Sequence, residues 1–364
     1  DSKTNLGILA QKTYKELYSD IRKSVDTCHR DGSLKRHVAR DPGKYIYKDA
    51  NLVPLLQDIR SSGKKTFIAT NSLWDYTHIV MNYLIDDKVG AEKDLAWLKY
   101  FDVVIVGSAK PKFFQASQAM FQIQTDTGCL LNTDQGNPMM SLESESEMSE
   151  PTPSYQQGKV FQGGNYKILN RMLGTESNSS ILYVGDHIYG DILKSKKTLG
   201  WRTMLVVPEM KNEVQALNRN KGTAEDLFQI RKQKERIQDE VQRIRWRKHV
   251  EVDIESTASM PRDEGQNRDP SGNCKRDASE VDALERELSV LSREHRLQLH
   301  KYHSDFHPIW GQFLKTGYQN SRFACQMERF ACLYTSEVGN LMYYSPNKSY
   351  RALQDEMPHD AILG

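Results

Sequence analysis

The sequence predicts an α/β fold in which helices cover a doubly wound parallel sheet of the Rossmann-like type. Four short apolar runs have the length and β-branched content of buried strands, and helical patterns separate them; they are residues 65–69, 102–106, 181–184 and 203–207. Polar residues also follow the ends of the first three runs. Right-handed crossovers would bring these ends to one edge of the sheet, where α/β proteins bind ligands.

The N-terminal segment, roughly residues 4–38, is predicted to be helical. Its apolar residues recur at helical spacing and form one face: Tyr14, Leu17, Ile21, Val25 and Cys28. Arg22, Asp26 and His29 share a neighbouring face. Charged residues on a helix usually form a solvated surface, so spacing alone favours a surface role for these three over a binding role.

The polar residues at the strand ends form the candidate site. Thr70 and Asn71 follow the first predicted strand, and Lys110 follows the second. After the third strand come Asp186 and, one turn into a predicted helix, Asp191. Two carboxylates with lysines nearby suit a hard cation such as Mg²⁺ that holds a phosphorylated substrate. The alternative is a helix N-terminus whose acidic residues interact with the helix dipole.

Composition limits the other functions of the chain. Lys and Arg number 50 and Asp and Glu 48, and the net charge of +2 argues against a dominant nucleic-acid-binding role. No apolar run approaches the roughly 18 residues of a membrane span, so we expect no membrane partner. The five cysteines form no Cys-x-x-Cys pair, which fits a reducing compartment, and we expect a cytoplasmic protein.

Changes in composition and periodicity divide the chain into four predicted segments. They are a helical segment (1–48), an α/β core (49–215), a helical hairpin (216–305) and C-terminal helices packed on the core (306–364). The core contains an acidic, Ser-rich loop at about 133–158, which is solvated by composition. In the hairpin, apolar residues repeat with an a/d rhythm on both sides of a flexible connection at 252–280.

Three blocks of sequence resemble motifs II, III and IV of the haloacid-dehalogenase phosphatase superfamily. They are Thr70-Asn71, Ala109–Phe114 (AKPKFF) and Gly185–Lys197 (GDHIYGDILKSKK), each after a predicted strand. More closely, nearly the whole chain resembles the cytosolic purine 5′-nucleotidase family, whose members are IMP- and GMP-specific. The resemblance implies a haloacid-dehalogenase core, with residues 1–48 as the remainder of a helical cap and with a C-terminal helical extension.

The resemblance also implies catalytic roles. Asp186 matches the family's Mg²⁺ ligand, and Asp191 matches the second acid of motif IV, which has a structural or supporting role. Lys110 would stabilise the phosphoryl oxygens as charge redistributes during transfer. Thr70 through its hydroxyl and Asn71 through its amide would donate hydrogen bonds to the phosphate.

The same resemblance gives the helical residues of the first segment a role in substrate binding. Arg22, Asp26, His29 and Lys35 match positions that contact the nucleoside in the purine 5′-nucleotidases. Asp26 could accept a hydrogen bond from a ring N–H of a purine, while Arg22 and His29 could donate to its acceptor edge. The implied ligand is a purine nucleoside monophosphate, and we also expect a homo-oligomer.

One part of the family pattern is not found in this sequence. The superfamily uses an aspartate nucleophile in a D-x-D motif at the end of its first strand, and no D-x-D-x-[TV] occurs here. The chain opens at Asp1 within amphipathic sequence. We therefore expect a fragment that lacks the nucleophile, the acid/base aspartate and one strand, and that is inactive alone.

Three functions stay open. The first is a Mg²⁺-dependent 5′-nucleotidase that hydrolyses purine nucleoside 5′-monophosphates through an aspartyl-phosphate. The second is a catalytically inactive, nucleotide-binding or regulatory member of the same family. A D-x-D-x-T motif in the upstream sequence would support the enzyme, and its absence would support the inactive member. The third is an interaction protein that binds partners through its helical hairpin. Deleting residues 223–302 and testing partner binding and oligomeric state would separate this role from catalysis.

Overall fold

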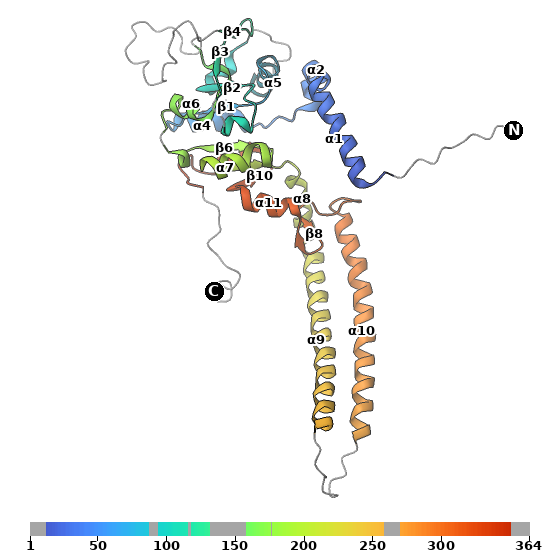
Figure 1. Cartoon of the computed structure of the whole chain (residues 1–364). Coiled ribbons are helices and arrows are strands. Elements are labelled where there is room, and N and C mark those ends of the chain that lie inside the picture. Colours follow the sequence, from blue (N-terminus) through green and yellow to red (C-terminus); the bar gives the residue numbers. More distant parts are fainter. Residues whose placement is uncertain are drawn as a thin grey trace, which may run out of the picture. The chain divides into compact units, whose positions relative to one another are not determined.

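A computed structural model describes residues 12–86, 94–115, 118–131, 158–175, 177–257 and 270–350 (Figure 1). The side chains of residues 251–257 and 270–278 are outside the description, as is most of the predicted acidic loop at 133–158. The chain divides into two compact units. One contains residues 1–207 and 326–364, and the other contains residues 208–325. The predicted boundaries of the four segments stay predictions.

The first unit is a mixed α/β structure with two sheets. The larger sheet has the strand order β1-β2-β5-β3-β4, in which β1, β2 and β5 are parallel and β3 and β4 are antiparallel. These strands are Phe67–Ala69, Val103–Val106, Val160–Gly163, Met120–Ile123 and Leu130–Leu131. The predicted strands at 65–69 and 102–106 are confirmed as β1 and β2. The other three were not predicted, because their runs are short and lack clear alternation.

The smaller sheet is parallel and has the order β10-β7-β6. β6 (Leu182–Gly185) and β7 (Arg202–Val206) correspond to the predicted strands at 181–184 and 203–207. β10 (Leu333–Thr335) lies within the C-terminal segment that is predicted to consist of helices (306–364), so that prediction is wrong for these residues. A three-residue strand is too short to produce a periodic pattern, and its pairing with β7 determines its conformation.

Two apolar clusters fill the first unit. All four residues of β2 are fully buried, and alternate side chains enter different clusters. One cluster is rich in aromatic rings that come from both sheets, because Phe67 of β1 stacks on Tyr183 of β6 and both lie near Trp201. The other cluster lies around Trp74, Trp97 and Val104. The aromatic cluster therefore connects the two sheets.

The N-terminal helices of this unit are α1 (Tyr14–Arg30), α2 (Ser33–Arg40), α3 (Pro42–Tyr45) and α4 (Leu52–Ser61). The helical structure predicted over 4–38 is confirmed from Tyr14 onwards, with a turn at Asp31 and Gly32 between α1 and α2, and residues 4–11 are outside the description. Gly32 has a φ of 72°, a left-handed conformation that glycine adopts without steric cost. Thr13 and Glu16 form a capping box at the start of α1.

Further helices complete the first unit. They are α5 (Trp74–Asp86), η1 (Ala96–Tyr100), η2 (Lys112–Phe114), α6 (Tyr166–Met172), η5 (Asn178–Ser180), η6 (Ile188–Leu193), α7 (Lys194–Leu199) and η7 (Val338–Tyr343). All of the η elements are short 3₁₀ helices except η6, which is a π-helix. Helix α11 (Arg322–Phe330) carries the chain from the second unit back into the first.

The second unit contains two long helices that run side by side, α9 (Lys221–Thr257) and α10 (Pro270–Ser304) (Figure 1). Ile237, Val241 and Ile244 of α9 pack against Val281 of α10 and its leucines, as the a/d rhythm predicts. Shorter elements of this unit are α8 (Met210–Arg219), β8 (Lys315–Thr316) and β9 (Gln319–Asn320). Helical structure continues through much of the predicted flexible connection at 252–280, and residues 258–269 are outside the description. Among the described helices, none has the length and apolarity that a membrane crossing requires.

Candidate functional site

A buried ion pair joins two loops at the carboxyl ends of the parallel strands. Lys110 follows β2, Asp191 follows β6, and the Lys110 Nζ lies 2.8 Å from the Asp191 Oδ1. The two side chains are only 14% and 7% exposed. A buried charge needs a partner and hydrogen bonds, and each of these residues provides both for the other. The pair therefore fixes the position of the Lys110 ammonium at the edge of both sheets.

Tyr183 of β6 completes this cluster. Its hydroxyl accepts a hydrogen bond from the Lys110 Nζ at 3.0 Å and donates one to the Asp191 Oδ1 at 3.1 Å. The Tyr183 ring packs against Phe67 and Phe114. Burial raises the pKa of the Tyr183 hydroxyl far above its usual range, and the nearby Asp191 carboxylate adds to this increase. Tyr183 is therefore a neutral donor at physiological pH.

Asn71 connects the loop after β1 to the loop after β2. Its Oδ1 accepts hydrogen bonds from the Lys110 backbone N–H at 2.6 Å and from the Ser108 hydroxyl at 3.1 Å, and its Nδ2 donates to the Lys110 carbonyl at 3.1 Å. Thr70 accepts the Ser108 N–H at its carbonyl. The structure thus brings Thr70, Asn71 and Lys110 together. One Nδ2 proton of Asn71 remains for a ligand, since an amide group has two.

The turn between β6 and α7 explains the position of Asp191. The helix predicted at this point begins as the π-helix η6, in which the Asp191 N–H bonds to the His187 carbonyl at 2.9 Å. A Cβ atom on Gly185 would lie 2.7 Å from the Asp191 Cβ, so only glycine allows this close approach. The Asp191 Oδ2 also accepts the His187 N–H at 3.4 Å. These contacts therefore hold the Asp191 side chain in the protein interior.

Asp186 has a different environment from Asp191. It is exposed at the carboxyl end of β6, on the same turn as the buried carboxylate. The described residues contain no group of three or more His, Cys, Asp or Glu side chains that could hold a metal ion. Mg²⁺ needs only one or two protein carboxylates when phosphate oxygens and water complete its octahedron, so an exposed Asp186 fits that type of site.

The predicted nucleoside-contacting residues do not contact this cluster through any hydrogen bond or ion pair among the described residues. Arg22, Asp26 and His29 are exposed on α1, where the Arg22 Nε is 3.5 Å from the Asp26 Oδ1. Lys35 of α2 is half-buried, with its Nζ 5.4 Å from the centre of the Tyr76 ring. Among the described residues, no hydrogen bond or ion pair joins these four side chains to Lys110 or Asp186.

Two residues of the site were not predicted from the sequence. Tyr183 occurs inside an apolar run, where an aromatic residue indicates core packing, and only the fold reveals the two partners of its hydroxyl. Ser108 is fully buried and bonds to Asn71, but an isolated serine after a strand has no distinctive pattern. The usable signal was the position of Tyr183, two residues before the Gly185-Asp186 step.

A charged cluster at the carboxyl ends of parallel strands is typical of α/β proteins that bind anionic ligands. The family to which the chain belongs follows from its sequence: the model of the 5′ nucleotidase family matches residues 1–362. The chain belongs to the 5′-nucleotidase family.

A similar curated protein is a 5′-nucleotidase domain-containing protein of Dictyostelium discoideum. It is 23% identical over 349 residues, which cover 95% of this chain and 49% of the relative. The chain therefore spans about half the length of the relative that it matches.

Proposed function

We propose that this chain contains the phosphate-binding and Mg²⁺-binding residues of a purine 5′-nucleotidase with a haloacid-dehalogenase-type, doubly wound core. The observation that carries the proposal is the buried Lys110–Asp191 pair, which holds an ammonium group beside Asn71 at the strand ends. A fixed positive charge stabilises phosphoryl oxygens without reorganising during the reaction. Family membership supports the reaction class.

In this proposal each residue of the cluster has one task. Lys110 neutralises the charge on the phosphoryl oxygens, and Thr70 and Asn71 donate hydrogen bonds to them. Asp191 and Tyr183 do not contact the substrate but hold Lys110 in place. Asp186 would hold Mg²⁺, which when bound supplies a Lewis acid that neutralises phosphate charge.

The reaction requires an aspartate nucleophile that a segment outside these 364 residues would supply. Its carboxylate oxygen attacks the phosphorus, and the bond from phosphorus to O5′ breaks as the nucleoside oxygen takes a proton from a second acid. Water then attacks the phosphorus of the aspartyl-phosphate, which releases inorganic phosphate and restores the carboxylate. Splitting the transfer into two steps is the advantage of a covalent intermediate.

Arg22, Asp26, His29 and Lys35 are proposed to contact the nucleoside. Arg22, Asp26 and His29 are exposed on α1, which leaves their polar groups available to a base and a ribose, and Lys35 on α2 is half-buried. Asp26 would accept the ring N–H of a 6-oxopurine, and that contact would favour purine over pyrimidine nucleotides.

The alternative is an inactive nucleotide-binding or regulatory member of the family. The engagement of Asp191 with Lys110 and Tyr183 favours this alternative for residues 1–364 alone, because a carboxylate held this way cannot attack phosphorus in line. We therefore expect phosphate binding by this chain without turnover. Turnover should require a longer form that carries a D-x-D-x-T segment.

Titration of the chain with inorganic phosphate and with IMP, followed by NMR, tests the proposal. Lys110→Met should weaken phosphate binding about tenfold or more, because it removes a charge-assisted hydrogen bond. Lys112→Met is the matched control, since Lys112 is exposed on the same loop, and it should leave binding unchanged. Asp186→Asn should abolish the Mg²⁺ dependence of IMP binding. Equal binding by all three variants and the parent chain would contradict the proposal.

A further inference from the structure

The packing between the two long helices of the second unit changes from apolar to basic along their length. Ile237 and its apolar neighbours of α9 pack against the valine and leucines of α10. Nearer to the start of α9, the same rhythm places Lys234 in this seam, three residues before Ile237, and Arg231 precedes it by one turn. On α10, His295 follows Leu291 at the next seam position. All three basic side chains are half-buried, and we call them the basic layer.

The three side chains of the basic layer lie close together. Burial lowers the pKa of the His295 imidazole, and the nearby positive charges of Lys234 and Arg231 lower it further. The guanidinium carbon of Arg231 lies 4.5 Å from the centre of the Tyr318 ring, which belongs to the turn between β8 and β9. The Tyr318 hydroxyl also hydrogen-bonds to the Nε2 of His295. Tyr318 therefore holds one basic residue of each helix in place.

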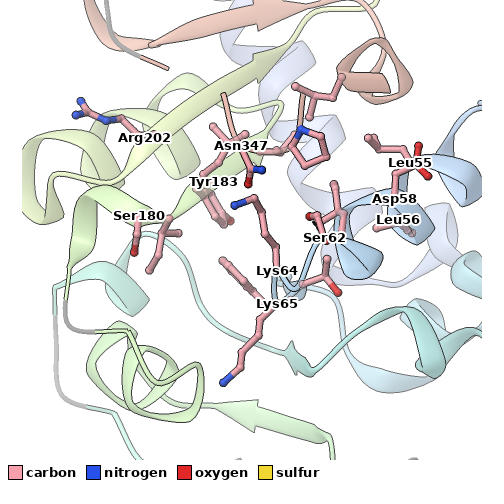
Figure 2. A pocket seen from close by; sticks show the side chains of 18 of the residues that line it. Leu55, Leu56, Asp58, Ser62, Lys64, Lys65, Ser180, Tyr183, Arg202 and Asn347 are labelled. Atoms are coloured by element: carbon pink, nitrogen blue, oxygen red, sulfur yellow. Dashed lines mark hydrogen bonds between the residues drawn. The ribbon is translucent and has the colours of Figure 1, made fainter. Parts of the chain in front are cut away.

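Two lysines of the first unit show how this chain compensates an ammonium group. Lys110 pairs with Asp191. Lys65, which lies beside the cavity between β1 and β6 in Figure 2, donates a hydrogen bond from its Nζ to the Leu173 carbonyl at 3.1 Å. Lys234 differs from both, because no described residue accepts a hydrogen bond from its Nζ or forms an ion pair with it. Its half-burial therefore removes water from the charge without supplying a replacement.

Arg231 and His295 also have unused hydrogen-bonding groups. The buried Nε of Arg231 has no acceptor among the described residues, and the Glu235 Oε1, on a side chain that is 62% exposed, lies 3.7 Å from it. In the described part of the chain, the hydroxyl of Tyr318 is the one hydrogen-bond partner of His295, and it occupies Nε2. The Nδ1 of His295 is therefore available. A buried donor that lacks an acceptor indicates a missing partner, such as an ion.

A role in helix register explains one polar residue in this seam but not three. A single lysine or asparagine in a coiled-coil seam fixes the register of the helices at a cost in stability. Three basic side chains in one layer repel one another, and the lowered pKa of His295 reflects this repulsion. An anion between them would remove the repulsion and also supply the missing acceptors.

We propose that the basic layer binds a phosphate group, which Arg231, Lys234 and His295 hold between α9 and α10. Arg231 offers a planar set of N–H donors that matches two phosphate oxygens, and Lys234 adds a positive charge. His295 donates through Nδ1 while its Nε2 stays bonded to Tyr318. Inorganic phosphate and the phosphate of a small monoester share this chemistry. The site belongs to the second unit and does not depend on the proposed function of the first.

NMR of the His295 ring in the 364-residue chain tests the site. The probe is inorganic phosphate, and sodium chloride holds the ionic strength constant. Phosphate should shift the His295 ring signals until the site is saturated and should raise the pKa of His295 by about one unit, because an adjacent anion favours the protonated ring. His303, which is half-buried on the same helix, is the internal control, and its signals should not respond.

Lys234→Met tests the contribution of the lysine to this site. It should weaken phosphate binding at His295 about tenfold, because one charged contact is lost. Methionine adapts well to apolar surroundings, so the hairpin should stay folded. Lys232→Met is the matched control, since Lys232 is exposed on the same helix, and it should leave the affinity unchanged. An unchanged affinity in Lys234→Met would overturn the proposal.

Titration with IMP separates the two sources of the phosphate group. Binding of IMP at His295 that equals or is weaker than that of inorganic phosphate identifies the free anion, and tighter binding of IMP identifies the monoester. Either result supports the site. No response of His295 to either ligand would overturn it, as would an equal response to sodium chloride alone. Phosphate binding that depends on Lys110 without any change at His295 would contradict this inference and leave the proposed function standing.

Discussion

The Lys110 Nζ and the Asp191 Oδ1 lie 2.8 Å apart in the interior, although the two residues are 81 positions apart in the chain. Removing one partner leaves an uncompensated buried charge, which typically costs about 3–5 kcal/mol. We therefore expect Asp191→Asn and Lys110→Met each to lower the free energy of unfolding by about this amount. Urea unfolding followed by circular dichroism measures the change.

The surface pair of Arg245 and Glu285 in the second unit is the control for this prediction. Its side chains are 53% and 44% exposed, so Glu285→Gln should cost no more than about 1 kcal/mol. The double variant Lys110→Met with Asp191→Asn should recover much of the loss, because it removes both charges. Additive losses in the double variant would show that the two residues do not interact.

Tyr183 should make the stability of the first unit depend on alkaline pH. Burial raises its pKa in the folded state, so above the ordinary tyrosine value of about 10 the unfolded chain loses the proton first. The free energy of unfolding should then fall with rising pH, by about 1.4 kcal/mol per pH unit for this one group. Below that pH the stabilisation is fully present.

Tyr183→Phe isolates this contribution because it keeps the ring and removes the hydroxyl. The difference in unfolding free energy between the parent chain and the variant should be constant from pH 7 to 9 and should shrink from pH 10 to 11. Urea unfolding at fixed ionic strength measures it. A difference that does not change with pH would mean that the Tyr183 hydroxyl ionises normally in the folded chain.

Gly185 should not tolerate a larger side chain. Alanine at this position would place its Cβ 2.7 Å from the Asp191 Cβ, and relieving the clash should displace Asp191 from Lys110. We expect a loss of about 1–3 kcal/mol in unfolding free energy, as is usual for overpacking, together with weaker phosphate binding. Gly222→Ala is the control, since nothing lies within 4 Å of its Cβ and helical alanine is favoured. Unchanged phosphate binding by Gly185→Ala would separate Asp191 from the function of Lys110.

The proposed contact of Asp26 with the nucleobase can be tested by nucleotide binding. Asp26→Ala should weaken binding of IMP by roughly ten- to a hundredfold, because losing one partner of a hydrogen bond costs about 1–3 kcal/mol. Binding of UMP should change little. Asp20→Ala is a matched control on the same helix, where Asp20 pairs with Lys12. Equal losses for IMP and UMP in Asp26→Ala would indicate that Asp26 supports the helix and does not read the base.

The sequence by itself determined the α/β class and four of the parallel strands, because buried strands require apolar runs that stand out from their flanks. It also identified Thr70, Asn71, Lys110 and Asp186 as strand-end residues. The antiparallel pair and β10 could not be predicted, since runs of two to four residues acquire their conformation from pairing.

Only the tertiary structure decided how the strand-end residues divide their roles. Asp186 and Asp191 are both aspartates on the same turn, yet Asp186 is exposed and Asp191 is buried against Lys110. The sequence predicts only a core role for Tyr183, and the structure shows that its hydroxyl hydrogen-bonds to both Lys110 and Asp191. Long-range contacts of this kind leave no local periodicity, so no reading of a single segment can reveal them.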